Sequence, residues 1–467
     1  MKRPLRNMSA LFAGDVASRG IGFLVTVYLA RILEPAGFGL VSVGMALLGH
    51  LQLLSSPGIQ LVETRNTARA DGMDDRRFGG VLTLRFVLSI VLFALALLVL
   101  FVNPYDPAVR RVMLWSLASL FPLALATDWY LQGMERMPPI GAARFAGYCV
   151  YGLAAWFLVR SLDDVAMAPA AFFLGAIVTT GMLWGTTASL RPVPRLKWDV
   201  GLWTQLLREN LPVGMAMFVG QMVMNLPPIV IAATTGTADA GVYNAALKLV
   251  FLLLIADRVL NAIFLPAFTR IRETKPADLE KIVSVTAKMV ITGVIVIVLL
   301  GNLLSSWGIA LVYGPAYGSA DPVFRILLLY VGLTLINSIA TNVLLASGYE
   351  RLYSSILIRG SLVLIVAMLI LTPLFGSIGT AIGAGVGELV TVLLMSWHAR
   401  RNGSFPPAGV FVPPLIAGCC SGIAGWLLWP IHPVVATGAA TVVLVGLMFI
   451  FRVFKSEDIA YMRERLV

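Results

Sequence analysis

Long apolar runs separated by short polar segments recur along the whole chain. Most are roughly 18 to 25 residues long, enough for a helix rising 1.5 Å per residue to cross a ~30 Å hydrocarbon layer. Fourteen runs fit, and we predict a helical span in each: 9–31, 40–62, 79–102, 109–131, 142–159, 167–189, 210–234, 241–265, 283–305, 322–345, 355–373, 376–397, 409–429 and 433–453. The pattern predicts an all-α polytopic membrane protein with about fourteen transmembrane helices and both termini in the cytoplasm.

One stretch of the chain occurs twice, at residues 106–144 and 321–359. The positions shared at an offset of 215 are Asp106 and Asp321, Arg110 and Arg325, Gly133 and Gly348, Glu135 and Glu350, and Arg144 and Arg359. About 22 mostly apolar residues lie between the Arg and the Gly, so each copy crosses the membrane once. An even number of predicted spans separates the copies, which predicts two parallel repeats related by an axis along the membrane normal.

A weaker repeat joins the first two spans to the seventh and eighth. Ala36-Gly37-Phe38-Gly39 and Ala238-Asp239-Ala240-Gly241 align at an offset of 202. Together the repeats predict two six-helix lobes and a remainder outside the symmetry. The predicted parts are an N-lobe at 1–190, a cytoplasmic connector at 191–209, a C-lobe at 210–400, and two extra spans with a cytoplasmic tail at 401–467.

Composition supports a membrane protein and argues against a nucleic-acid partner. Of the 467 residues 58% are hydrophobic and 13% charged, whereas about a quarter are charged in soluble proteins. The formal net charge is +11, but most Lys and Arg fall in the segments predicted to be cytoplasmic, as the positive-inside rule describes. The three Cys residues lie in apolar runs and show no zinc-ligand spacing.

Five runs carry a resemblance to a known family. They are PAGFGLVSVG at 35–44, DWYLQGMER at 128–136, GVYNAALKL at 241–249, YGPAYGSADPVFRIL at 313–327 and LTPLFGSIGTAIGA at 371–384. In this order and spacing they resemble the oligosaccharide flippases of bacterial polysaccharide biosynthesis, the polysaccharide-transporter branch of the multidrug and oligosaccharidyl-lipid exporter superfamily. The extra spans thirteen and fourteen look more like those of the related lipid II flippases.

The resemblance implies a two-lobed, V-shaped fold that works by alternating access. A protein of this family would move a polyprenyl-pyrophosphate-linked glycan from the cytoplasmic to the outer leaflet of the bacterial inner membrane. Its partners would be that glycan, membrane lipids and other polysaccharide-assembly proteins. No cofactor is expected beyond a coupling H⁺ or Na⁺.

Four cationic residues lie within predicted spans: Lys248, Arg258, Arg19 and Arg85. Inserting an ionised side chain there costs ~2.5 to 3.5 kcal/mol on insertion scales, so each of these residues is a candidate for a functional role. If they face the cleft between the lobes, they provide contacts for a pyrophosphate or an acidic sugar. Arg19 lies four residues after Asp15, so a structural ion pair is an equal alternative, and Arg85 has the alternative of extending to the cytoplasmic edge.

Four acidic residues are candidates for coupling transport to protons or sodium: Asp15, Asp128, Asp257 and Glu388. A carboxylate in a low-dielectric cleft can load and release a proton. For Asp128, which begins the DWYLQGMER run, a helix-end role is the alternative. A metal site is not expected.

A lipid II-type flippase is one alternative that the resemblance leaves open, and two other functions remain open as well. A drug or cation exporter of the same superfamily would favour an acidic cavity, whereas the spans here hold about equal numbers of cations and acids. A polymerase or ligase of polysaccharide assembly would need catalytic groups on a large outward loop. No predicted outward loop exceeds about 15 residues, and no nucleophile with its base, metal cluster or phosphate-binding loop is evident, so we predict that the chain is not an enzyme.

Overall fold

The computed structural model describes residues 2–69, 73–192, 198–401, 405–430, 433–451 and 453. This part of the chain is almost entirely helical and contains no strand. It divides into two compact units, Met1–Gly241 and Val242–Val467, each described below by itself. The predicted tail after residue 453 and residues 193–197 of the predicted connector lie outside the described residues.

The first unit contains nine helices and the start of a tenth among its described residues. They are α1 (Lys2–Ser55), α2 (Ile59–Arg69), α3 (Asp75–Val102), α4 (Pro107–Ala118), α5 (Leu120–Ala124), α6 (Asp128–Gly133), α7 (Met137–Leu158), α8 (Met167–Leu190), α9 (Val200–Thr234) and α10 (Thr237–Leu253). Helix α9 packs on α1, α2 and α3. The predicted connector and the predicted seventh span therefore lie within this unit, while the division of the chain into lobes at 1–190 and 210–400 stays a prediction.

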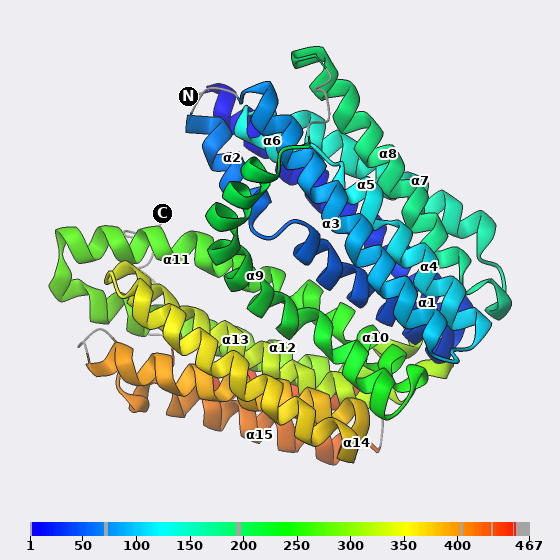
Figure 1. Ribbon diagram of the computed structural model, residues 1–467. Coiled ribbons are helices and arrows are strands. Elements are labelled where there is room, and N and C mark those ends of the chain that lie inside the picture. The colour runs from blue at the N-terminus through cyan, green and yellow to red at the C-terminus, as the bar shows by residue number, and fades with distance from the viewer. Residues whose placement is uncertain are drawn as a thin grey trace. The chain divides into compact units, whose positions relative to one another are not determined.

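The second unit contains the rest of α10 and six further helices among its described residues. They are α11 (Ile255–Thr274), α12 (Leu279–Tyr313), α13 (Ala320–Ala346), α14 (Glu350–Arg401), α15 (Val412–Leu428) and α16 (Pro433–Ile450). Helices α13 and α14 pack along each other, as Figure 1 shows. The two predicted extra spans correspond to α15 and α16, which pack on α12 through a core that includes Leu299, Ala417 and Leu444.

Several helices are long and apolar enough to cross a membrane. Among the described residues eight segments meet this condition, and the bent α9 makes a ninth. Two of the eight hold a pair of predicted spans each, because α1 breaks at Glu34 (φ 52°) and α14 at Gly376 (φ 59°). Their outer faces carry apolar side chains such as Leu374, 67% exposed, as a lipid-facing surface requires. The chain is an all-α, multi-pass membrane protein, as the apolar pattern predicted.

The repeated stretch is present in both units, but its structural register differs from its sequence register. In each unit a helix ends in a Schellman turn, with Arg136 N donating to Leu131 O at 2.8 Å and Tyr349 N donating to Leu344 O at 3.0 Å. The following helices begin at Met137 and at Glu350, which are 213 residues apart. The offset of 215 read from the sequence is therefore wrong by two residues.

Packing of the next two helices supports the shorter offset, because the paired glycines are 213 residues apart and their threonine partners 212. Gly147 of α7 faces Thr179 of α8, and a Cβ on Gly147 would overlap the threonine Oγ1. Gly360 and Thr391, in the two halves of α14, make the same contact in the second unit. Small residues of this kind let membrane helices approach closely. The two units thus share a helix pair packed in the same way.

The weaker repeat produces a reciprocal contact inside the first unit. A Cβ on Gly39 would overlap Thr237 O, and a Cβ on Gly241 would overlap Pro35 O. Thr237 follows Pro35 by 202 residues, the same offset that relates the glycines. Such an exchange of equivalent contacts is the pattern of a local two-fold relation between the segments.

Candidate functional site

The first unit holds a cavity of about 410 Å³ lined by polar and aromatic side chains from α1, α2, α3, α6, α7 and α8. Four of the eight predicted site residues line it: Asp15, Arg19, Arg85 and Asp128. The other four belong to the second unit. The structure therefore brings together residues that lie up to 113 positions apart in the sequence.

A chain of charged contacts runs along the cavity wall. Arg19 Nε donates to Asp15 Oδ2 at 3.0 Å, and Arg144 donates from Nη1 to Asp15 Oδ1 at 3.1 Å. The other terminal nitrogen of Arg144 donates to Asp128 Oδ2 at 3.3 Å, and Gln60 Nε2 donates to the same oxygen at 3.0 Å. Each carboxylate in this chain is thus neutralised by a guanidinium, which is how buried charges are stabilised in proteins.

Arg85 is buried at 5% exposure, and its two terminal nitrogens donate to the backbone. Its Nη1 donates to Ala126 O at 2.9 Å and its Nη2 to Leu123 O at 2.8 Å. The two carbonyls lie where the span breaks between α5 and α6, and such a break inside a membrane needs internal partners. Arg85 therefore stabilises the broken span, a role that neither of its sequence interpretations included.

Aromatic rings form another wall of the cavity. Tyr151 meets Phe172 edge to face, with ring centroids 5.6 Å apart, and Tyr148 lies 6.4 Å from Tyr151. The ring of Tyr148 rests against Gly22 of α1, where a Cβ would come within 2.9 Å of it. Neither tyrosine hydroxyl has a hydrogen-bond partner among the described residues, so both remain available to a ligand.

The second unit places Asp257 of α11 and Glu388 of α14 beside polar residues of α13. Asp257 accepts hydrogen bonds from Ser338 Oγ and from Asn261 Nδ2, the latter at 3.1 Å. Glu388 Oε1 accepts from Asn337 Nδ2 at 3.1 Å. Among the described residues no cation pairs with either carboxylate. Asp257 thus has one partner on its own helix, Asn261, and one on α13, Ser338.

The two remaining predicted cations have few contacts. Lys248 is half-buried, and its Nζ lies 5.9 Å from the ring centroid of Phe251, the one partner found among the described residues. Arg258 is exposed and makes no hydrogen bond or ion pair in the described part of the chain. Their contact with substrate stays a prediction.

Sequence reasoning missed Arg144 and Gln60 as site residues. Arg144 was noted only as the last residue of the repeat, and its apparent counterpart Arg359 is exposed on α14. The two arginines are not structurally equivalent, because a shift of two residues turns a helix by about 200°. A cation about two turns after the DWYLQGMER segment was the available signal for Arg144.

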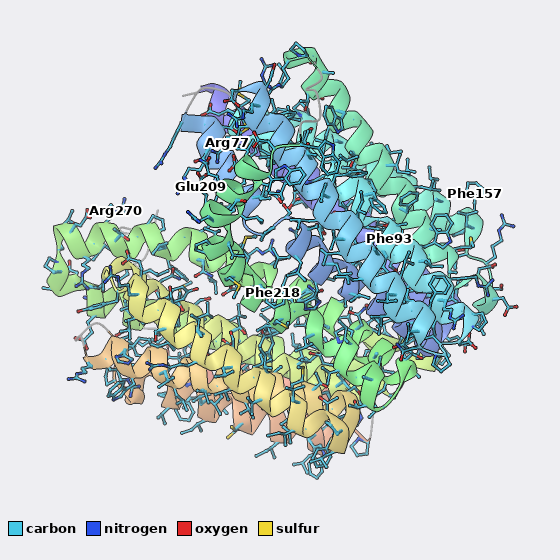
Figure 2. All side chains as sticks on the ribbon, viewed as in Figure 1. Arg77, Phe93, Phe157, Glu209, Phe218 and Arg270 are labelled. Atoms are coloured by element: carbon cyan, nitrogen blue, oxygen red, sulfur yellow. The ribbon has the colours of Figure 1, made fainter. Side chains whose placement is uncertain are left out.

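A second group of charges lies at the end of this unit where α2, α3 and α9 meet. Arg77 binds the fully buried Glu63 through two nitrogens, at 2.8 and 2.7 Å, and Glu209 at 2.6 Å. Figure 2 shows Arg77 and Glu209 facing each other. Nearby, Asp199 caps α9 and binds Arg76; a backbone N–H from Leu202 and the Arg76 guanidinium hold the pKa of Asp199 below its usual range. These pairs fix the start of α9 against α2 and α3.

Comparisons with known proteins agree with this architecture. The chain is similar to a protein of Escherichia coli (strain K12) described as a candidate O-antigen transporter, at 26% identity, with 85% of this chain and 97% of that protein covered. It is 23% identical to the succinoglycan biosynthesis transport protein ExoT of Rhizobium meliloti (strain 1021), over 71% of this chain and 67% of that protein.

Solved structures show the same fold. The lipid II flippase MurJ in an inward closed conformation superposes with a TM-score of 0.74 at 13% identity, covering 95% of this chain and 98% of that one. An inward-facing multidrug resistance MATE family transporter gives a TM-score of 0.52 at 14% identity, covering 86% and 94%. Fold and site together define a helical, multi-pass membrane protein with a polar cavity in its first unit.

The family itself follows from the match of residues 5–272, more than half of the chain, to the family described as polysaccharide biosynthesis protein. The chain belongs to that family.

Proposed function

We propose that this protein is a flippase that moves a polyprenyl-pyrophosphate-linked oligosaccharide from the cytoplasmic to the outer leaflet by alternating access. The observation that carries the proposal is a polar, charge-lined cavity inside a multi-pass protein of the polysaccharide biosynthesis family. Relatives named as O-antigen and succinoglycan transporters, and a fold shared with a lipid II flippase, support it. These relatives are transporters rather than enzymes.

In this proposal Lys248 contacts the pyrophosphate, and Arg258 supports it. A doubly charged group cannot enter a dry cleft without compensating cations. Both side chains are free of carboxylate partners among the described residues, so neither charge is already neutralised. The three arginines of the cavity differ in this respect, because each already binds a carboxylate or backbone carbonyls.

A cation gradient drives the cycle in this proposal, through Asp257 and Glu388. Neither carboxylate has a cationic partner in the described part of the chain, and their Asn and Ser surroundings suit a proton or a sodium ion. Asp15 and Asp128 suit this role less well than the sequence suggested, because Arg144 is bound to both. No other cofactor is proposed.

We propose that the protein lies in the bacterial inner membrane with both termini cytoplasmic, and that other polysaccharide-assembly proteins are its partners. Cysteine substitutions at Tyr105 and Arg136 test the orientation. A membrane-impermeant maleimide added to intact spheroplasts should label position 105 and should leave position 136 unlabelled until the membrane is opened. Labelling of position 136 from outside would contradict the orientation.

Transport in purified proteoliposomes tests the function directly. We expect the full chain to make a fluorescent polyprenyl-pyrophosphate-oligosaccharide accessible to a quencher on the opposite side, while lipid II and the dye ethidium are not moved. Movement of lipid II instead would make the chain a lipid II-type flippase, and extrusion of ethidium would make it a drug or cation exporter. In cells, a deletion strain should accumulate the lipid-linked glycan at the inner leaflet.

A further inference from the structure

We infer that the cavity of the first unit binds a sugar ring of the glycan and does not bind the pyrophosphate. The inference rests on the proposed function and assigns one part of the substrate to one place. It departs from the expectation that Arg19 and Arg85 are phosphate contacts.

The charge balance of the cavity argues against a phosphate site. Its two carboxylates, Asp15 and Asp128, would face an incoming pyrophosphate with like charge. Arg19 and Arg144 are held by these acids, and Arg85 is held by backbone carbonyls. A pyrophosphate would have to compete with Asp15 and Asp128 for the guanidinium groups of Arg19 and Arg144, while the two carboxylates repel it.

The same polar groups suit sugar hydroxyls. A hydroxyl both donates and accepts hydrogen bonds, so it can bind a carboxylate and a guanidinium that are already paired with each other. Arg19 uses only Nε for its carboxylate bond, and its side chain is 59% exposed. Gln52 and Gln60 add amide groups to the lining. The cavity thus offers donors and acceptors together with no need for a charged ligand.

The aromatic wall suits the other surface of a sugar, its C–H face. Tyr151 and Phe172 meet at 90°, and the phenol groups of Tyr148 and Tyr151 retain unused hydroxyls. An apolar ring with a polar tip binds ligands that are apolar on one side and polar on the other. The volume of about 410 Å³ falls in the range of ~300–1,000 Å³ typical of small-molecule sites.

Binding of two lipids to the purified full chain in nanodiscs tests the inference. One probe is polyprenyl pyrophosphate alone, and the other is the same lipid carrying the first sugar of the glycan. The dissociation constant of the bare lipid divided by that of the sugar-bearing lipid measures how much the sugar contributes to binding. We expect Tyr151→Phe and Gln60→Ala to reduce this ratio by about three- to tenfold each, the effect of one lost hydrogen bond, and to leave binding of the bare lipid unchanged.

Tyr105→Phe is the matched control, because Tyr105 is exposed on the loop between α3 and α4, and it should leave both constants unchanged. Equal affinity of the wild-type protein for the two lipids would overturn the inference, as would variants that weaken both lipids equally. Either result would leave the flippase function standing. Failure of the wild-type protein to bind either lipid would overturn the proposed function and this inference with it.

Discussion

Arg144 is the side chain on which the charge balance of the cavity depends. It alone bridges the two carboxylates, with Nη1 at 3.1 Å from Asp15 and Nη2 at 3.3 Å from Asp128. Its planar fork makes this possible, whereas a lysine ammonium offers a single point of charge. The residue therefore links α1, α6 and α7 at the one place where all three contribute an ionised group.

We predict that Arg144→Gln lowers glycan transport by tenfold or more, because hydrogen bonds to charged groups contribute roughly 1.5–3 kcal/mol each and two are lost. Arg144→Lys should retain less than half of the activity. The control is Arg359→Gln, the counterpart in the sequence repeat, whose side chain is exposed and unpaired among the described residues. Equal loss in the two glutamine variants, measured in proteoliposomes, would contradict the structural register.

Candidate residues could be found in the sequence, but their partners could not. A charge inside an apolar run is visible without a structure, and this rule found Asp15, Arg19 and Asp128. It could not tell that Arg85 binds two carbonyls at the break between α5 and α6, because Pro122 inside the predicted span indicates a break but not which side chain binds there. Gln60 was missed for a related reason, because a neutral amide inside a span is not costly enough to draw attention.

Lys248 is the strongest remaining candidate for contact with the pyrophosphate. We predict that Lys248→Ala cuts transport strongly, on the order of thirtyfold in apparent affinity if the loss is about 2 kcal/mol, while membrane insertion is unaffected. Lys248→Arg should retain part of the activity, and Arg401→Ala is the control. Normal transport by Lys248→Ala would leave Phe251 contact and packing as its role.

At the scale of helices, the two glycine contacts make a quantitative comparison possible. Gly147→Ala and Gly360→Ala should each destabilise the protein by roughly 1–3 kcal/mol, as overpacking does, because a Cβ would overlap a threonine Oγ1 in both places. Gly181→Ala in α8 and Gly385→Ala in α14 are the controls, since a Cβ there meets nothing within 4 Å. Thermal unfolding in detergent measures all four.

A second substitution should separate the two contacts. Thr391→Ala removes the overlapping oxygen in the second unit, and the next nearest atom of that threonine, its Cβ, lies 3.1 Å from the added carbon. In the first unit Gly175 O remains 2.7 Å away whatever Thr179 becomes, and backbone cannot rotate out of the way. We therefore expect Thr391→Ala to restore most of the stability of Gly360→Ala, and Thr179→Ala to restore little of that of Gly147→Ala.

The repeat shows what a sequence comparison can and cannot measure in a helical membrane protein. It detected the two copies, and the structure contains them. It placed them two residues out of register because Asp106 and Asp321 were matched, whereas the helices they open begin at Pro107 and Ala320, which are 213 residues apart. Identity of a turn residue is weaker information than the packing of Gly147 and Gly360, and packing requires coordinates.

At the scale of the whole molecule, the units differ in how they handle buried charge. In the first unit the cavity carboxylates are matched by guanidinium groups. In the second unit Asp257 and Glu388 have only amide and hydroxyl partners among the described residues. If one unit recognises the glycan and the other carries the driving ion, their substitutions should affect different properties of transport.

We predict that Asp257→Asn and Glu388→Gln abolish the dependence of transport on an imposed proton or sodium gradient, while a residual gradient-independent rate remains. The expectation follows from charge, because a neutral amide neither takes up a proton nor offers a negative charge to a sodium ion. Tyr151→Phe should do the reverse, lowering affinity for the glycan while the response to the gradient persists. Glu280→Gln, on an exposed turn at the start of α12, is the control. The measurement is the transport rate in proteoliposomes with and without each gradient. If neither gradient changes the wild-type rate, or if the acid variants still respond fully, then the second unit does not carry the coupling ion.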